Sequence, residues 1–428
     1  MKSSCPLTLL LIFAALLTLA AGVENVRAFH SGGAGECDGC HSMHNYQEGI
    51  PTGQAGPSLL KGSDSSSTCL ICHQVAGDTG PTAYHISTPD GEIPFGVPPK
   101  QLSPGGDFAW LKKTFTWYAD LVSPLAYSQG ERHGHNIVSL DFGYQPDSAK
   151  ATSPGGSYPS IYLSCISCHD PHGKYRRNMD GSTLTSGSPI RDSGSYSSSP
   201  LPDSQTAVGV YRMLGGSGYT PGGLTSGLAF TYAPPVAVAP DNYNMSEAVS
   251  PTRVAYGSGM SEWCRNCHRN MHDGTNSIEH PSPEALGTDI INYYNSYIKT
   301  GDLTGTIPTA YSSLVPFEVG TSNYALLNGI LTNTPAKGPD LADGTPQVMC
   351  LSCHRPHASG WDSIMRWNSK SSQIEFNGKY SQEGQIYQPY GQGRTEAEAL
   401  QAYYQTPAVK FDANQQSLCT KCHSTIPH

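Results

Sequence analysis

The sequence has few charged residues. Asp, Glu, Lys and Arg make up 14% of the 428 residues, against roughly a quarter in ordinary globular proteins. Acidic residues outnumber basic ones, 34 to 25, and the formal net charge is −9. Nucleic-acid binding relies on clustered positive charge, so this composition argues against a nucleic-acid partner.

The sequence also lacks a long apolar run beyond its first residues. "MKSSCPLTLLLIFAALLTLAAG" places Lys2 before an apolar stretch, residues 7–21, that is short for a membrane span. Residues 26–28 fit a small-x-small cleavage site, so we expect residues 1–28 to be a signal peptide and residues 29–428 to form a single unit. We therefore expect an exported chain with no membrane span. Export by itself leaves open whether the chain stays in the periplasm or reaches the cell surface.

No cysteine of the expected mature chain stands alone. Cys5 falls in the signal peptide, and the other twelve form six C-x-x-C pairs, each followed at once by histidine. Chance would give on the order of 0.01 such pentapeptides in a chain of this composition. The six motifs are Cys37-Cys40-His41, Cys69-Cys72-His73, Cys165-Cys168-His169, Cys264-Cys267-His268, Cys350-Cys353-His354 and Cys419-Cys422-His423.

C-x-x-C-H is the attachment motif of c-type haem. The two thiols add to the two vinyl groups of one porphyrin edge, and the histidine that follows reaches the iron as its proximal ligand. Six disulfides or zinc ribbons would also use paired cysteines, but neither requires a histidine after each pair. The sequence therefore predicts six covalently bound haems.

Six haem irons need six further axial ligands unless some stay open. Ten histidines remain after the proximal ones, which favours bis-histidine ligation of every iron. Methionine is the rival ligand and would raise the haem potential. The methionines near haem motifs are Met43, Met179, Met271 and Met349.

Four of the ten histidines lie close behind a proximal one. His44, His172 and His357 come three residues after a motif histidine, and His272 comes four after. Axial ligands approach iron from opposite faces, and three extended residues reach only roughly 10 Å. A close second histidine therefore serves a different haem, or none.

The other histidines lie farther from their nearest motifs along the chain. His85, His135 and His280 are in long segments between motifs, where the chain can fold back over a porphyrin. His30 is at the expected mature N-terminus and, with His272, is a weaker candidate. We expect His133 and the last residue, His428, to be idle. The predicted distal ligands are thus His44, His85, His135, His172, His280 and His357.

The composition predicts a mostly irregular fold. With 46 glycines and 33 prolines, we expect loops and turns, few short helices, minimal β-structure and one elongated unit organised around a stacked haem chain. Helices are predicted over residues 284–299, capped by Ser282-Pro283, over 395–404, with a capping box, and over 321–331. We expect the haems to supply the apolar interior. "SPGG" occurs at Ser103 and at Ser153 and indicates turns.

Several segments resemble the OmcS-type extracellular hexahaem c-type cytochromes. They are "FHSGGAGECDGCHSMH", "CHQVAGDTGP" with "YHIST", "CHDPHGKYRR", "RVAYGSGMSEWC" and "CLSCHRPHASG". The family comes from bacteria that respire on metal oxides and electrodes. The resemblance implies a mostly irregular fold, bis-histidine haems and end-to-end filaments with one continuous line of haems. It also implies that His44 ligates the fifth haem, held by Cys350-Cys353-His354, of a neighbouring subunit.

The leading functional hypothesis is therefore a long-range electron conduit. Its partners would be further copies of the chain, other cytochromes and extracellular acceptors such as metal oxides. Bis-histidine iron has no open site, so we expect no enzyme activity. Two alternatives stay open: a monomeric periplasmic or surface electron shuttle, and a multihaem oxyanion reductase, which would need one open iron.

Overall fold

The structure is a computed structural model of the chain. It describes residues 37–42, 46–47, 50–51, 59–75, 84–118, 124–186, 190–193, 199–222, 224, 226–240, 254–271, 282–307, 315–333, 338–371, 373–375, 378–380, 392–411 and 415–423. The expected signal peptide lies outside these residues, as do His30, His44, His272, His280 and His428. No helix in the described part of the chain is both apolar enough and long enough to cross a bilayer.

The α-helices are short, as predicted. They are α2 (Cys37–Cys40), α3 (Ser65–His73), α4 (Met260–Cys264), α5 (Thr288–Ser296), α6 (Tyr324–Asn333), α7 (Cys350–Cys353) and α8 (Glu396–Ala402). Single turns of 3₁₀ helix are η1 (Asp90–Glu92), η2 (Phe108–Lys112), η3 (Gly130–Arg132), η4 (Leu140–Phe142), η5 (Ser160–Tyr162), η6 (Cys165–Ser167), η7 (Tyr211–Met213), η8 (Ser226–Leu228), η9 (Asp362–Ile364), η10 (Ala408–Lys410) and η11 (Leu418–Lys421).

The three predicted helices correspond to α5, α8 and α6. The capping box that begins α8 is present: the Thr395 hydroxyl accepts from the Glu398 N–H at 3.1 Å, and the Glu398 carboxylate accepts from the Thr395 N–H at 3.0 Å. The predicted start of α5 was wrong. This helix begins at Thr288, after an extended Gly287 at its N-cap, so Ser282-Pro283 does not cap it.

The β-structure is limited to small sheets. Strands β5 (Arg176–Arg177), β6 (Thr183–Leu184), β7 (Ile190–Ser193) and β8 (Ala207–Gly209) form one sheet in the order β6-β5-β8-β7. Within it β7 and β8 are parallel and the other pairs antiparallel. Antiparallel pairs join β1 (Tyr46–Gln47) to β2 (Ile50–Pro51), β3 (Phe115–Trp117) to β4 (Ala126–Ser128), and β9 (Ala237–Val238) to β10 (Ala255–Tyr256).

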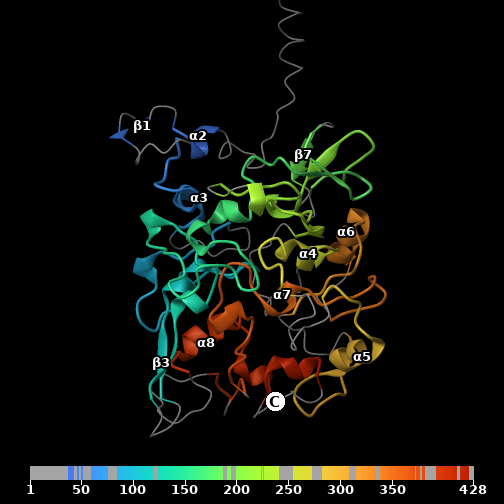
Figure 1. Ribbon diagram of the computed structural model, residues 1–428. Coiled ribbons are helices and arrows are strands. Elements are labelled where there is room, and N and C mark those ends of the chain that lie inside the picture. The colour runs from blue at the N-terminus through green and yellow to red at the C-terminus, as the bar shows by residue number, and fades with distance from the viewer. Residues whose placement is uncertain are drawn as a thin grey trace, which may run out of the picture.

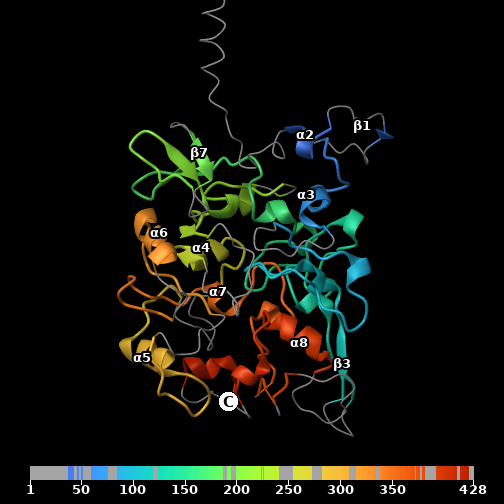
Figure 2. The ribbon, with the colours of Figure 1, turned by 180° about the vertical axis from the view of Figure 1, so that it is seen from behind.

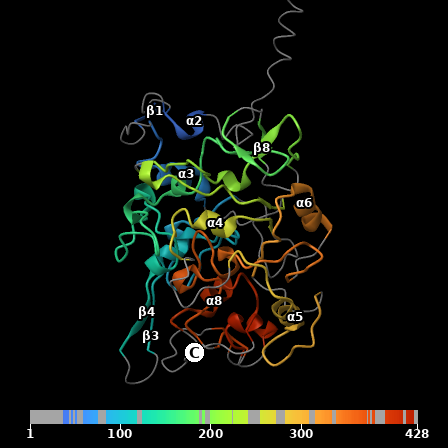
Figure 3. The same ribbon diagram turned by 45° about the vertical axis from the view of Figure 1, so that its right-hand side comes forward.

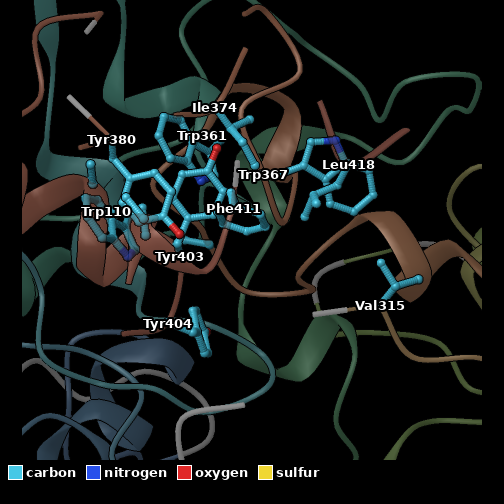
Figure 4. Packing of buried hydrophobic residues seen from close by; sticks show 14 of the residues in the cluster. Trp110, Val315, Trp361, Trp367, Ile374, Tyr380, Tyr403, Tyr404, Phe411 and Leu418 are labelled. Carbon is cyan, nitrogen blue, oxygen red and sulfur yellow. The ribbon is translucent and has the colours of Figure 1, made fainter. Parts of the chain in front are cut away.

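Aromatic side chains form a core in the C-terminal half. Figure 4 shows Trp110, Trp361, Trp367 and Tyr403 converging with other rings from separate segments of the chain. Tyr380 stacks on Tyr403 with ring centroids 4.2 Å apart. We expected the chain to lack an apolar interior of its own, and this core shows that it has one. The chain builds an aromatic core of its own beside the haem motifs.

The haem motifs are spread along the molecule. In Figures 1 and 2, α2 and α3 lie near one end, α4 and α7 lie in the middle, and the red C-terminal segment reaches the opposite end. Figure 3 shows the same order from a third direction. The first and last motifs therefore lie toward opposite ends of the molecule.

Candidate haem sites

All six C-x-x-C-H motifs fold as a single helical turn. At five of them the histidine N–H donates to the carbonyl of the first cysteine, at 2.8 Å for His41, 3.0 Å for His169, His354 and His423, and 3.1 Å for His268. The remaining motif histidine, His73 of the second motif, is the last residue of α3. This turn places both thiols and the imidazole on the same short helical segment, as attachment to one porphyrin requires.

Backbone carbonyls fix the tautomer of the motif histidines. The Nδ1–H groups of His73, His169, His268 and His354 donate to the carbonyls of Tyr84, Arg212, Pro154 and Ser363, at distances of 2.8, 2.7, 2.8 and 2.9 Å respectively. A carbonyl can only accept, so the proton must be on Nδ1. The lone pair is then on Nε2, which is the arrangement that metal-binding histidines use.

Three motif histidines face a second histidine from a distant segment. The ring centroids of His41 and His172 lie 6.5 Å apart, with the rings within 11° of parallel. Those of His169 and His357 are also 6.5 Å apart. Those of His268 and His135 are 6.1 Å apart. The structure thus brings three of the six predicted distal histidines, His172, His357 and His135, close to proximal ones.

These pairs have the spacing that a shared iron would need. A metal–imidazole bond is about 2 Å long and the coordinating nitrogen lies roughly 1 Å from its ring centroid, so two rings on opposite faces of one iron have centroids about 6 Å apart. No pair joins a motif histidine to the histidine three residues behind it. The described residues therefore fit the haem group that the motifs imply.

Desolvation keeps two of these distal rings, those of His135 and His357, neutral. Desolvation, with the facing His268 as the next cause, lowers the pKa of His135 to about 4. Desolvation and the facing His169 lower the pKa of His357 to about 3. The Nδ1–H of His135 donates to the Pro356 carbonyl at 2.6 Å, which also leaves its Nε2 as the free base. Neutral imidazole is the form that binds iron.

His133 is different although it too is buried. Its Nδ1–H donates to the Trp110 carbonyl at 3.1 Å, and its Nε2 is 2.6 Å from the Ser128 hydroxyl. Both ring nitrogens are therefore engaged in hydrogen bonds. This fits the expectation that His133 is not a ligand.

His85 is the one other predicted distal ligand in the described part of the chain. It is buried, with 3% of its surface exposed, and packs beside Tyr84 with ring centroids 4.6 Å apart. The Tyr84 carbonyl accepts from Nδ1 of His73. His85 therefore directly follows Tyr84, whose carbonyl lies on the Nδ1 side of the His73 ring, away from Nε2.

Sequence reasoning missed the role of the two SPGG turns. The turn at 103–106 lies against His357, where a Cβ on Gly105 would be 2.7 Å from the ring Nδ1. The turn at 153–156 supplies the carbonyl of Pro154 to His268. A Cβ on Gly156 would lie 1.9 Å from the Cys267 carbonyl oxygen. Each turn therefore supports a predicted axial histidine, and the repeated tetrapeptide was the available signal.

Ten of the twelve motif cysteines are partly buried, and Cys37 and Cys72 are exposed. Burial raises the pKa of Cys168, Cys267 and Cys353 to about 12. Among the described residues, no three His, Cys, Asp or Glu side chains form a group that could hold a metal ion. The rival methionines differ in exposure: Met179 is 70% and Met271 44% exposed, whereas Met349 is buried with Leu351 and Tyr256. Met43 lies outside the described residues.

Comparison with known proteins is decisive for the family. No family model matches the chain. The C-type cytochrome OmcS of Geobacter sulfurreducens is 48% identical over 444 aligned residues, which cover 99% of this chain and all of the relative. The solved structures of the OmcS nanowires and of the outer membrane cytochrome S filament, from the same organism, each match with a TM-score of 0.84. Both are 48% identical and cover 93% of this chain and all of their own.

The chain belongs to the OmcS family of c-type cytochromes. This confirms the resemblance drawn from the motif segments and the prediction of a mostly irregular fold with short helices. A c-type cytochrome carries covalently bound haem, and in this chain the C-x-x-C-H motifs are the residues that can attach it.

Proposed function

We propose that the chain is an extracellular electron-transfer protein that binds six bis-histidine haems and polymerises into filaments. Three histidine pairs at the spacing of a shared iron carry this proposal. On this spacing we assign His172 to the first haem, with His41, His357 to the third, with His169, and His135 to the fourth, with His268. The similarity to filament-forming OmcS supports the polymer.

The second, fifth and sixth haems take their distal ligands from the remaining candidates. We assign His44 of a neighbouring subunit to the fifth haem, with His354, and His280 or His272 to the sixth, with His423. His85 and His30 are the candidates for the second haem, with His73.

The protein residues hold and insulate the redox groups. Bound haem supplies a one-electron iron couple. The carbonyls that accept from Nδ1 fix the ring orientation and increase the basicity of Nε2. With both axial positions filled by histidine, no position is left for a small substrate, so we propose that the chain is not an enzyme. Electrons would pass from haem to haem toward external acceptors such as metal oxides or other cytochromes.

The placement of the motifs suits end-to-end assembly. The first motif and the C-terminal segment lie at opposite ends of the molecule (Figure 1), so joined copies would bring their terminal motifs together. A distal ligand supplied by the next copy would tie polymerisation to haem ligation. We infer an extracellular or outer-surface location for such filaments.

The test is purification of the secreted protein with a haem count, spin-state spectroscopy and electron microscopy. The proposal expects six haems per chain, low-spin ferric signals from all of them, and filaments that conduct between electrodes. Discrete particles at every concentration would favour the monomeric shuttle. A high-spin signal from one haem in six of the assembled protein, together with oxyanion reduction, would favour the reductase.

A further inference from the structure

The first cysteines of neighbouring motifs lie close together at two places. The thiol of Cys69, in the second motif, is near that of Cys165, in the third. The thiol of Cys264, in the fourth motif, is near that of Cys350, in the fifth. The elements that carry these cysteines are also in contact: α3 packs against η6, and α4 packs against α7. Porphyrins attached at these sulfurs would have adjoining edges, so the structure holds two haem pairs built alike.

The same serine contact joins the motifs in both pairs. The Ser66 hydroxyl accepts from the backbone N–H of Cys165 at 3.1 Å. The Ser261 hydroxyl accepts from the backbone N–H of Cys350 at 3.2 Å. Each serine is three residues before the first cysteine of its own motif, and they are 0% and 1% exposed. Each therefore links the start of one motif to the first attachment residue of the next.

The receiving motifs also share a feature. Ser167 and Ser352, each two residues after the first cysteine, accept from the N–H of the residue before that cysteine, at 2.9 and 3.1 Å. This bond closes the turn, so the N–H of the first cysteine, at a helix start, donates to a group outside that turn. A partly buried donor of this kind is costly unless something accepts from it, and the hydroxyls of Ser66 and Ser261 accept from these two N–H groups.

The sequence restricts this arrangement to the two pairs. A serine three residues before the first cysteine occurs only in the second and fourth motifs. A serine two residues after it occurs only in the third and fifth motifs. The first and sixth motifs have neither. The serine pattern therefore distinguishes two pairs of successive motifs, the second with the third and the fourth with the fifth.

We propose that Ser66 and Ser261 are positioning residues that set the separation of the haems within these two pairs. The inference rests on the proposed function, because it requires haems at all four motifs. The hydrogen bond from each cysteine N–H to its serine lies beside the cysteines that attach the two haems. It therefore fixes the edge of one porphyrin relative to the edge of the next. Loss of either hydroxyl changes the separation of the haems in its own pair and leaves the other pair unchanged.

The experiment compares filament maps of the wild type, Ser66→Ala and Ser261→Ala by electron cryomicroscopy. In Ser66→Ala the iron–iron distance of the second and third haems should change by about 0.5 Å or more, the tolerance within which such sites are held. The distance between the fourth and fifth haems is the internal reference. Ser261→Ala should show the reverse. Unchanged distances in both variants would overturn the proposal, and so would equal changes in both pairs.

Ser67→Ala is the matched control. Ser67 is as buried as Ser66, but its hydroxyl contacts Asp64 at the start of its own helix at 2.8 Å, Ser139 at 3.1 Å and the backbone N–H of Asp141 at 3.2 Å. Its loss should lower stability without changing either iron–iron distance. A change equal to that of Ser66→Ala would reduce Ser66 to a purely structural role.

A second measurement covers variants that do not polymerise. Closely spaced haems give a bisignate Soret band in circular dichroism. Its amplitude should fall in Ser66→Ala and Ser261→Ala and stay at the wild-type value in Ser67→Ala. Equal amplitude in all three would contradict the proposal. Failure of the proposed function itself would be visible in the wild type, as fewer than six haems or no filament.

Discussion

Two histidines two positions apart, His133 buried and His135 partly buried, have opposite surroundings. His133 is hydrogen-bonded through both ring nitrogens to Trp110 and Ser128. His135 uses only Nδ1 in such a bond and faces His268 with its ring. Burial alone therefore does not identify a ligand in this molecule. What identifies a ligand is a ring nitrogen whose lone pair is not already used in a hydrogen bond.

Replacing the two histidines in turn tests this distinction. His135→Ala should convert one haem in six from low-spin to high-spin, because its iron loses a ligand. His133→Ala should leave every haem low-spin and lower the free energy of unfolding by about 2–4 kcal/mol, since it leaves buried polar partners unpaired. Electron paramagnetic resonance and denaturant unfolding measure the two effects. High-spin iron in His133→Ala would show that it is a ligand.

Glu318 is a buried carboxyl between two haem motifs. It is 0% exposed and accepts from the Met260 N–H at 2.7 Å. Burial, aided by nearby Glu262, raises its pKa from 4.5 to about 7. A raised pKa means that ionisation is harder in the folded chain than in the unfolded one. This group therefore lowers stability as pH rises from about 4.5 to about 7.

Glu318→Gln should remove that pH dependence and keep an acceptor for Met260. We expect the variant to be more stable than wild type by up to about 3 kcal/mol near pH 8 and equally stable near pH 4, from about 1.4 kcal/mol per pKa unit. Guanidinium unfolding of the haem-loaded protein gives the comparison, with exposed Glu284→Gln as control. The same difference at both pH values would contradict the assignment.

Residue identity could be predicted where chemistry requires a pattern. The cysteines and proximal histidines follow from the motif alone, and the spacing argument removed His172 and His357 from their own haems. Pairing them with the first and third motifs needed the fold, because His172 meets a ring 131 positions away along the chain. No local pattern carries such contacts. Glu318 likewise has no signal in the sequence.

At the scale of elements, turns rather than long helices position the predicted axial histidines. The turn at 153–156 is bonded to the fourth motif on both sides: Ser153 donates to the Cys267 carbonyl at 2.6 Å, and the Pro154 carbonyl accepts from His268. Gly156 permits this approach because it has no Cβ. The repeat of SPGG was visible in the sequence, but its docking partners were not.

Gly156→Ala should therefore be strongly destabilising. The new Cβ would meet the Cys267 carbonyl oxygen, which belongs to backbone and cannot rotate away. We expect a loss of about 3 kcal/mol and weaker support of His268. Gly91→Ala is the control, because a Cβ there meets nothing within 4 Å. Equal unfolding free energies for the two variants would show that the contact is not tight.

Helix prediction succeeded where caps are local and failed where the cap depends on context. The capping box of α8 needs only Thr395 and Glu398, which are in the sequence together. The start of α5 was placed too early because Ser282-Pro283 fits the pattern of a helix start. The aromatic core was missed because most of its rings come from segments outside the helices and strands, which have no hydrophobic periodicity.

At the scale of the whole molecule, assembly and haem ligation are proposed to depend on one residue. His44 comes three residues after His41 in the sequence, and the helix α2 that precedes His41 lies near one end of the molecule. We predict that His44→Ala gives monomers with six covalent haems, one of them without its low-spin signal. Haem count, spin-state spectra and electron microscopy check this. Assembled filaments with six low-spin haems would show that no ligand is supplied by His44 of a neighbour.

The central claim is that this chain carries a line of bis-histidine haems whose ligands come from distant segments. A side-chain-resolution cryomicroscopy map of the secreted assembly tests it most directly. The account predicts filaments in which His172, His357 and His135 ligate the irons of the first, third and fourth haems. A map in which any of these irons has a different distal ligand, or an open position, would contradict it.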